Sequence, residues 1–191
     1  MPMSLWSFTM LEIVVFVAAS VALVYISRDS LRVPKSHGFY RFFAWELMLV
    51  LIVMNMKGWY DAPLTLDQMI CSVLMSASLL LAIMGYQSLR QFGEQDDSRD
   101  HEPLLLFEKT TVLVTRGIFR YVRHPMYSSL IFLDGGLFFK KMSWSSASIA
   151  LVALVFLLFA ALAEEVENIR YFGAKYEDYM KRTKRFVPFV L

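Results

Sequence analysis

Long apolar runs limit what this chain can fold into. A membrane-crossing helix needs about 20 mostly apolar residues, and we expect such helices at residues 5–26, 39–56, 66–86, 127–139 and 145–163. The fourth run is the shortest, about 20 Å long as a helix. Hydrophobic residues make up 57% of the sequence and charged residues 19%, against about 45–50% and 25% in soluble domains. The pattern predicts an all-α integral membrane protein with about five transmembrane helices, the last two forming a helical hairpin.

Basic residues are distributed unevenly between the loops. Nearly all of the 19 lysines and arginines fall in the first loop, the third loop and the C-terminal tail. The second and fourth loops hold only Lys57, Lys140 and Lys141. Because cytoplasmic loops are enriched in Lys and Arg, we expect a multi-pass protein with its N-terminus outside and its C-terminus in the cytoplasm.

Several classes of function find no support. Cys71 is the single cysteine, and His37, His101 and His124 lie far apart, so no metal site is predicted. There is no G-x-G-x-x-G or P-loop motif for a soluble nucleotide fold. The net charge of +2 gives no reason to expect nucleic acid as a partner.

The chain divides into two regions by composition. Residues 1–102 hold the first three spans and a polar connection. Residues 103–191 hold the last two spans, preceded by an amphipathic segment at 103–122 that we expect to lie against the membrane surface or the helix bundle.

Two polar clusters flank the predicted hairpin. The first ends in Arg123-His124-Pro125-Met126-Tyr127, where Pro125 disfavours a helical His124 and favours a new helix start. The second contains Glu164-Glu165 and runs on to Tyr176 and Tyr179. Both belong to the predicted cytoplasmic side, so we expect them to be close in space.

The ordered combination G-x-x-x-x-x-R-H-P-x-Y, hairpin, E-E and F-G-x-x-Y-x-x-Y resembles isoprenylcysteine carboxyl methyltransferases and the related phospholipid methyltransferases. Gly117, Phe172-Gly173, Arg185 and Pro188 complete the pattern, which spans about residues 104–191. The resemblance implies S-adenosylmethionine as cofactor and a lipid or lipidated acceptor. It implies a cofactor-binding set made of Thr111, Val112, Leu113, Val114, Phe119 (a tyrosine in the family), His124, Pro125, Met126, Tyr127 and Glu164.

The acceptor is left open by the sequence. In the carboxyl methyltransferases an arginine one helical turn before the cofactor-binding glutamate faces the acceptor, and this chain has Ala160 there. We therefore expect Ala160 to face the same cavity and favour a neutral amine, as on phosphatidylethanolamine, over a carboxylate. We also expect Glu46 and Asp134 to face the substrate, and Arg41 is the alternative source of a guanidinium in place of the missing arginine. No catalytic residue is assigned.

Other interpretations remain. A sterol or lipid reductase shares part of the pattern but normally has more spans. A non-catalytic membrane scaffold or transporter component would carry Arg116, Arg120 and Arg123 as interfacial anchors and the two glutamates as a solvated helix end. Binding of S-adenosylhomocysteine, a nicotinamide cofactor or neither would distinguish the three.

Overall fold

The computed structural model describes residues 9–60, 64–94 and 110–187. In these ranges the elements are helices, with one isolated parallel bridge between Val122 and Lys184. The predicted all-α class is confirmed. The helices are α1 (Met10–Leu31), α2 (His37–Asn55), α3 (Leu66–Phe92), α4 (Pro125–Lys140), α5 (Trp144–Phe172) and α6 (Ala174–Arg182), with 3-10 turns η1 (Met56–Gly58) and η4 (Gly117–Arg120).

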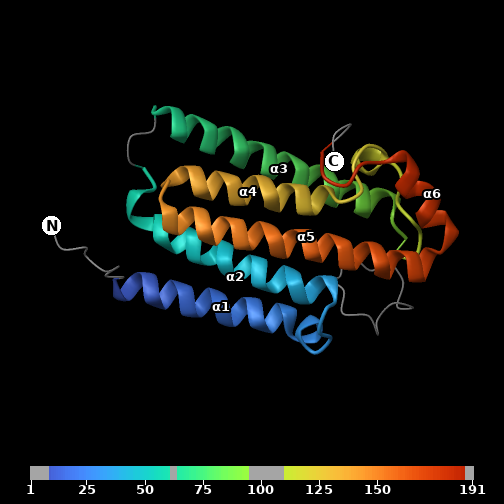
Figure 1. Ribbon diagram of the computed structural model, residues 1–191, viewed down its shortest axis with the longest axis horizontal. Coiled ribbons are helices and arrows are strands. Elements are labelled where there is room, and N and C mark those ends of the chain that lie inside the picture. Colours follow the sequence, from blue (N-terminus) through green and yellow to red (C-terminus); the bar gives the residue numbers. More distant parts are fainter. Residues whose placement is uncertain (1–8, 61–63, 95–109, 188–191) are drawn as a thin grey trace.

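The long helices lie side by side in the order α3, α4, α5, α2, α1 (Figure 1). Helix α6 and the segment before α4 gather at one end of this row. Helices α4 and α5 form the expected hairpin, because the link between Lys140 and Trp144 is short and the two helices pack together.

Within the described residues, four helices have the length and composition to cross a bilayer: α1, α2 with η1, α3 and α5. Helix α4, which contains the fourth predicted span, has 16 residues and is about 24 Å long, shorter than a hydrocarbon core of about 30 Å. Helix α5 has 29 residues and is about 43 Å long. Its final turns therefore extend beyond an apolar layer of that thickness, and these turns carry Glu164 to Asn168.

Local sequence explains where the helices begin. Thr9 and Glu12 form a capping box at α1, as do Ser143 and Ser146 at α5. The Ser36 side chain accepts the Phe39 N–H at the start of α2. Pro125 occupies the first turn of α4, as expected from its sequence.

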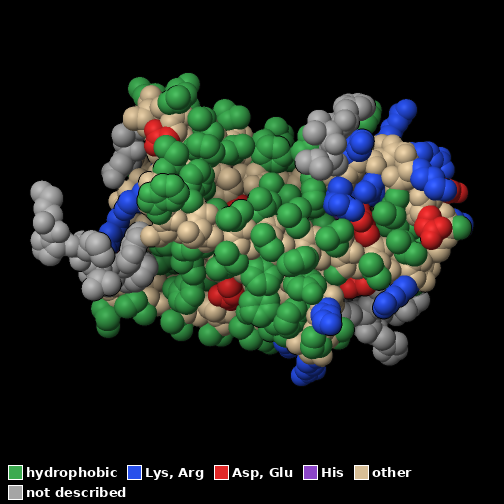
Figure 2. Space-filling view, in the orientation of Figure 1, with side chains coloured by type: hydrophobic (Ala, Val, Ile, Leu, Met, Phe, Trp, Pro, Cys, Tyr) green, Lys and Arg blue, Asp and Glu red, His purple; other side chains and the backbone are tan. Residues whose placement is uncertain are grey.

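The surface has the pattern of a membrane protein. Large apolar side chains are exposed along the long helices, among them Val14, Val73, Leu80, Leu151 and Phe159. Figure 2 shows this apolar band and basic side chains gathered at the α6 end. Soluble monomers rarely expose apolar surface so continuously, so the band fits contact with lipid.

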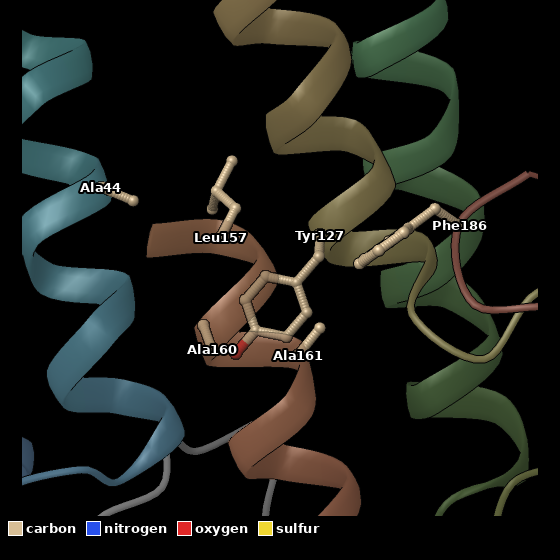
Figure 3. Close-up of a cluster of buried hydrophobic side chains, with 6 residues drawn as sticks. All are labelled: Ala44, Tyr127, Leu157, Ala160, Ala161 and Phe186. Atoms are coloured by element: carbon tan, nitrogen blue, oxygen red, sulfur yellow. The ribbon is translucent and has the colours of Figure 1, made fainter. Parts of the chain in front are cut away.

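A small apolar cluster joins α2, α4 and α5 near the α6 end. Its members are Ala44, Tyr127, Leu157, Ala160, Ala161 and Phe186 (Figure 3). Helices α2 and α5 run antiparallel, so His37 at the start of α2 meets Glu167 near the end of α5. This register carries α2 residues to the end of the bundle that holds the R-H-P motif.

Some sequence predictions fall outside the described residues. They concern the start of the first span, the boundary at residues 102 and 103, residues 103–109 of the amphipathic segment, His101 and Pro188.

Candidate active site

A cavity of about 260 Å³ opens at the α6 end of the bundle. Its walls come from α2, α3, α4, α5, α6 and the segment that precedes α4. It combines an apolar side with acidic, basic and aromatic groups, listed here by element: His37, Arg41 and Trp45; Ala82 and Leu89; Thr110, Leu113, Val114, Phe119, Arg123 and His124; Pro125, Met126, Tyr127, Ser129 and Leu130; Glu164, Glu167, Asn168 and Phe172; Tyr176 and Tyr179.

The turn at Arg123 and His124 is held by the C-terminal segment. Arg123 N–H donates to Lys184 O at 2.8 Å and His124 N–H donates to Arg185 O at 3.1 Å. Ser128 Oγ donates to Phe186 O at 2.7 Å. These bonds satisfy backbone groups that would otherwise be buried and unpaired, and they fix the position of the His124 ring.

Glu165 is the centre of a buried charge cluster. Its side chain accepts hydrogen bonds from Arg123 Nε at 3.0 Å and from Arg185 Nε and Nη2 at 3.0 and 2.7 Å. His124 Nε2 lies 3.4 Å from the same carboxylate. The guanidinium of Arg123 also donates to the carbonyls of Met180 and Thr183. Helix α5, the R-H-P turn and the C-terminal segment are therefore joined at one carboxylate.

The two adjacent glutamates have different surroundings. Glu165 is 4% exposed and bonded within the cluster. Glu164 lines the cavity, with its side chain 30% exposed and Oε1 at 3.8 Å from His124 Nδ1. Consecutive residues on a helix point in different directions, which separates a structural carboxylate from one available to a ligand.

Gly117 meets a steric requirement at the entrance of the motif. Its φ is +62°, and a Cβ atom there would lie 2.3 Å from Ser88 Oγ. Both observations favour glycine, because other residues seldom adopt this backbone conformation and no space exists for a side chain. The close approach fixes the loop that carries Phe119 against α3.

Eight of the predicted cofactor residues line the cavity: Leu113, Val114, Phe119, His124, Pro125, Met126, Tyr127 and Glu164. The other two, Thr111 and Val112, line an adjoining groove of about 710 Å³, as does Leu113. Thr111 is held there by its N–H and Oγ1, which donate to Glu94 O at 2.8 and 3.0 Å.

The three substrate-facing candidates, Ala160, Glu46 and Asp134, do not line this cavity or the adjoining groove. Ala160 is fully buried in the apolar cluster, where the Tyr127 hydroxyl oxygen lies beside it (Figure 3). Glu46 accepts from Ser20 Oγ at 3.0 Å, at the contact between α1 and α2. Asp134 is buried in α4 but is not part of either cavity wall.

Helix α2 supplies His37 and Trp45, which sequence reasoning did not place in the cavity, and Arg41, which it named only as a substitute for the missing arginine. The His37 ring is 1% exposed and Nδ1 lies 2.5 Å from Glu167 Oε2. Arg41 is 4% exposed, and its guanidinium lies 4.9 Å from the centre of the Trp45 ring. The sequence contained a signal for Glu167, the partner of His37. It follows Glu164 by three residues, so the two glutamates share a face of α5 and both should face the cavity.

Two tyrosines of α6 complete the wall. Tyr176 and Tyr179 are buried, and Tyr179 Oη donates to Phe119 O at 2.7 Å. Burial raises the pKa of both phenols well above the ordinary value, because a buried phenolate loses its hydration. Both therefore stay neutral at physiological pH and act by packing and hydrogen bonding.

The wall offers complementary groups for a zwitterionic ligand with an aromatic base. Carboxylates at Glu164 and Glu167 suit a cation, guanidinium groups at Arg41 and Arg123 suit an anion, and Phe119 and Phe172 offer ring faces. Arg123 and Glu167 already have partners in the protein. Of the two carboxylates, Glu164 is therefore the better candidate for a ligand contact.

The part of the chain that forms most of this site matches a known protein family. The family model described as phospholipid methyltransferase matches residues 66–178, more than half of the chain. No curated protein and no solved structure matches. The match includes the R-H-P turn and both glutamates and excludes α1, α2, the last four residues of α6 and the segment that follows it.

Proposed function

We propose that this multi-pass membrane protein, which belongs to the phospholipid methyltransferase family, transfers a methyl group from S-adenosylmethionine to an amphipathic, lipid-like acceptor. The observation that carries the proposal is the meeting of the His124–Tyr127 turn, the Leu113–Val114 segment and Glu164 around one cavity. These parts are separated in sequence, and the resemblance implies the same cofactor role for all of them.

The residues present fit S-adenosylmethionine. Glu164 would accept hydrogen bonds from its ammonium group, the backbone of Leu113 and Val114 would pair with the adenine edge, and Phe119 or Tyr127 would face the adenine or the sulfonium. When bound, the cofactor supplies an electrophilic methyl group. The chain's contribution is to orient the two reactants in line, which accounts for up to about 7–11 kcal/mol of a barrier.

A phospholipid amine is the acceptor that the cavity suits best. No basic residue of α5 stands in the turn before Glu164, and Ala160 is packed in the core. Arg41 supplies a buried positive charge from α2 instead. A guanidinium binds phosphate well, so Arg41 would hold the phosphodiester of a phospholipid. A prenylcysteine carboxylate is the second candidate, because the same guanidinium also pairs with a carboxylate.

The proposal is tested with purified protein, labelled S-adenosylmethionine and two acceptors offered separately, phosphatidylethanolamine vesicles and a farnesylcysteine analogue. We expect label in the lipid fraction that resists mild base. Base-labile label on the farnesylcysteine alone would instead support carboxyl methylation. No transfer to either, with no binding of S-adenosylhomocysteine, would contradict the proposal and favour a scaffold. Binding of a nicotinamide cofactor would favour a reductase.

A further inference from the structure

His37 and Glu167 form a hydrogen-bonded pair in the cavity wall. His37 begins α2, which lies outside the matched residues 66–178, and Glu167 lies one turn beyond Glu164 on α5. The pair therefore brings a group from the N-terminal helices to the glutamate face that we assign to the cofactor.

Glu167 holds His37 at two points, the backbone N–H and the imidazole ring. Its Oε1 accepts the backbone N–H of His37 at 3.0 Å, and its Oε2 lies 2.5 Å from His37 Nδ1. A carboxylate is an acceptor, so the proton of this bond belongs to Nδ1. In the neutral ring the lone pair is then on Nε2.

Other charged and titratable groups line the same cavity. They are Glu164 of α5, Arg41 of α2, Arg123 and His124 of the turn before α4, Tyr127 of α4, and Tyr176 and Tyr179 of α6. Arg41 follows His37 by one helical turn, so the two share a face of α2. A phospholipid held at its phosphodiester by Arg41 would bring its amine, a few bonds away, to the His37 ring.

An amine acceptor requires a proton acceptor before it can react. Near neutral pH an alkylamine is an ammonium ion, which has no lone pair to attack a methyl carbon. We propose that His37, oriented by Glu167, is the general base that takes a proton from the ammonium group of the acceptor. This inference rests on the proposed methyl transfer and specifies the acceptor as a protonated amine.

The step balances as follows. The ammonium proton moves to His37 Nε2, and the amine lone pair is freed. That pair forms the C–N bond while the methyl C–S bond breaks and its electrons stay on sulfur, which becomes a neutral thioether. The imidazolium afterwards releases its proton to water through the open end of the cavity, and Glu167 remains ionised and acts as the positioning residue.

A purely structural role is the alternative, because the pair also joins the start of α2 to the end of α5. The substitution His37→Asn separates the two roles. Its amide N–H occupies a place similar to Nδ1–H and can still donate to Glu167, but the side chain has no basic nitrogen. Asp29→Asn is the matched control for a lost carboxylate, since Asp29 is an exposed partner of Arg28 and Arg32 on α1.

The kinetic experiment compares two phosphatidylethanolamine acceptors, the natural one and an analogue whose fluorinated head-group amine is unprotonated at neutral pH. We expect His37→Asn to lower kcat for the natural acceptor about 100-fold and to leave kcat for the analogue within about threefold of wild type. Glu167→Gln should show the same selectivity to a smaller degree. Equal losses for both acceptors, or no loss, would overturn the assignment.

A second readout does not depend on turnover. The sequence contains three histidines, so imidazole ¹⁵N labelling with His37→Asn as reference identifies the His37 signals. We expect a neutral ring protonated on Nδ1 at neutral pH in the wild type, and a changed tautomer balance in Glu167→Gln. A ring protonated on both nitrogens throughout the active pH range would exclude a base.

The outcomes separate this inference from the proposed function. Calorimetry should show the same S-adenosylhomocysteine affinity for His37→Asn as for wild type. If the wild type methylates only carboxylates, methyl transfer stands and the base is excluded, because a carboxylate is already ionised. If the wild type transfers no methyl group to any acceptor, both proposals fail.

Discussion

Glu165 and Arg185 form a bidentate ion pair, with Arg185 Nε and Nη2 donating to the two carboxylate oxygens at 3.0 and 2.7 Å. Parallel guanidinium–carboxylate bonds fix geometry as well as supply energy. This pair secures the C-terminal segment against α5, and the segment in turn holds the backbone of the R-H-P turn. Residues 184–186 are thus part of the framework of the cavity.

Removing this carboxylate should destabilise the whole end of the bundle. Glu165→Gln leaves the buried Arg123 without its counter-charge, at a cost of about 3 kcal/mol. For a chain of this length the apparent Tm in detergent should fall by about 6–12 °C. Asp178→Asn, which breaks the exposed pair with Lys181, should change Tm little. Equal shifts in the two variants would show that the Glu165 cluster does not hold the fold.

Gly117→Ala should destabilise the loop that carries Phe119. The added methyl would contact Ser88 Oγ at 2.3 Å, and the backbone has φ +62°, so we expect a loss of about 1–3 kcal/mol. Gly135→Ala is the matched control, because its Cβ would meet Leu74 Cδ1 at an ordinary 3.5 Å. Thermal unfolding measures both variants. The double variant Ser88→Gly/Gly117→Ala removes the contact with Ser88 but keeps the unfavourable backbone conformation, so we expect its stability to recover only in part. Full recovery of stability would show that backbone strain is not a cause.

Much of this site follows from sequence, and the exceptions have physical causes. Pro125 fixes a helix start locally, and the hairpin brings Glu164 to the His124 turn whatever the other helices do. The position of His37 depends on the register of α2 against α5, a long-range contact that no short pattern encodes. Ala160 shares a face with Glu164, but within one turn α5 passes from the cavity into the core beside Tyr127. Glu164, which the resemblance singles out, lines the cavity, whereas packing directs Glu165 to Arg123 and Arg185.

The tyrosines of α6 give a pH dependence at the alkaline end. Burial raises the folded-state pKa of Tyr176 and Tyr179 above the unfolded value of about 10. The folded state then binds more protons, so this stabilisation is complete below pH about 10 and is lost as pH rises further. Tyr176→Phe should reduce the fall in Tm between about pH 9.5 and about pH 11, a range that brackets the unfolded-state phenol pKa of about 10. Tyr60→Phe, at an exposed site, is the control and should not change this fall in Tm. If Tyr176→Phe leaves the dependence of Tm on pH unchanged, the Tyr176 phenol is not buried in the folded protein.

Topology depends on whether the short helix α4 crosses the bilayer. It packs between α3 and α5, so we expect it to cross despite its length, giving five crossings with the C-terminus inside. In a Cys71→Ala background, a cysteine at Met142, after α4, should react with an impermeant thiol reagent from outside, and one at the exposed Arg116, before α4, only after the membrane is opened. Reaction of both positions from the same side would show that α4 does not cross and would contradict the predicted orientation.

Glu164 should be the carboxylate that contributes most to cofactor affinity. It lines the cavity with a partly exposed side chain, while Glu165 is occupied by two arginines. A hydrogen bond to a charged group contributes about 1.5–3 kcal/mol, so Glu164→Ala should raise the Kd of S-adenosylhomocysteine about 10- to 150-fold by calorimetry. Glu177→Ala on the exposed side of α6 is the control and should bind as the wild type does. Since Glu164 is not part of the Glu165 cluster, its loss should leave Tm of the ligand-free protein nearly unchanged. An unaltered Kd in a folded Glu164→Ala variant would remove Glu164 from the cofactor site and leave Glu167 as the other carboxylate that lines the cavity.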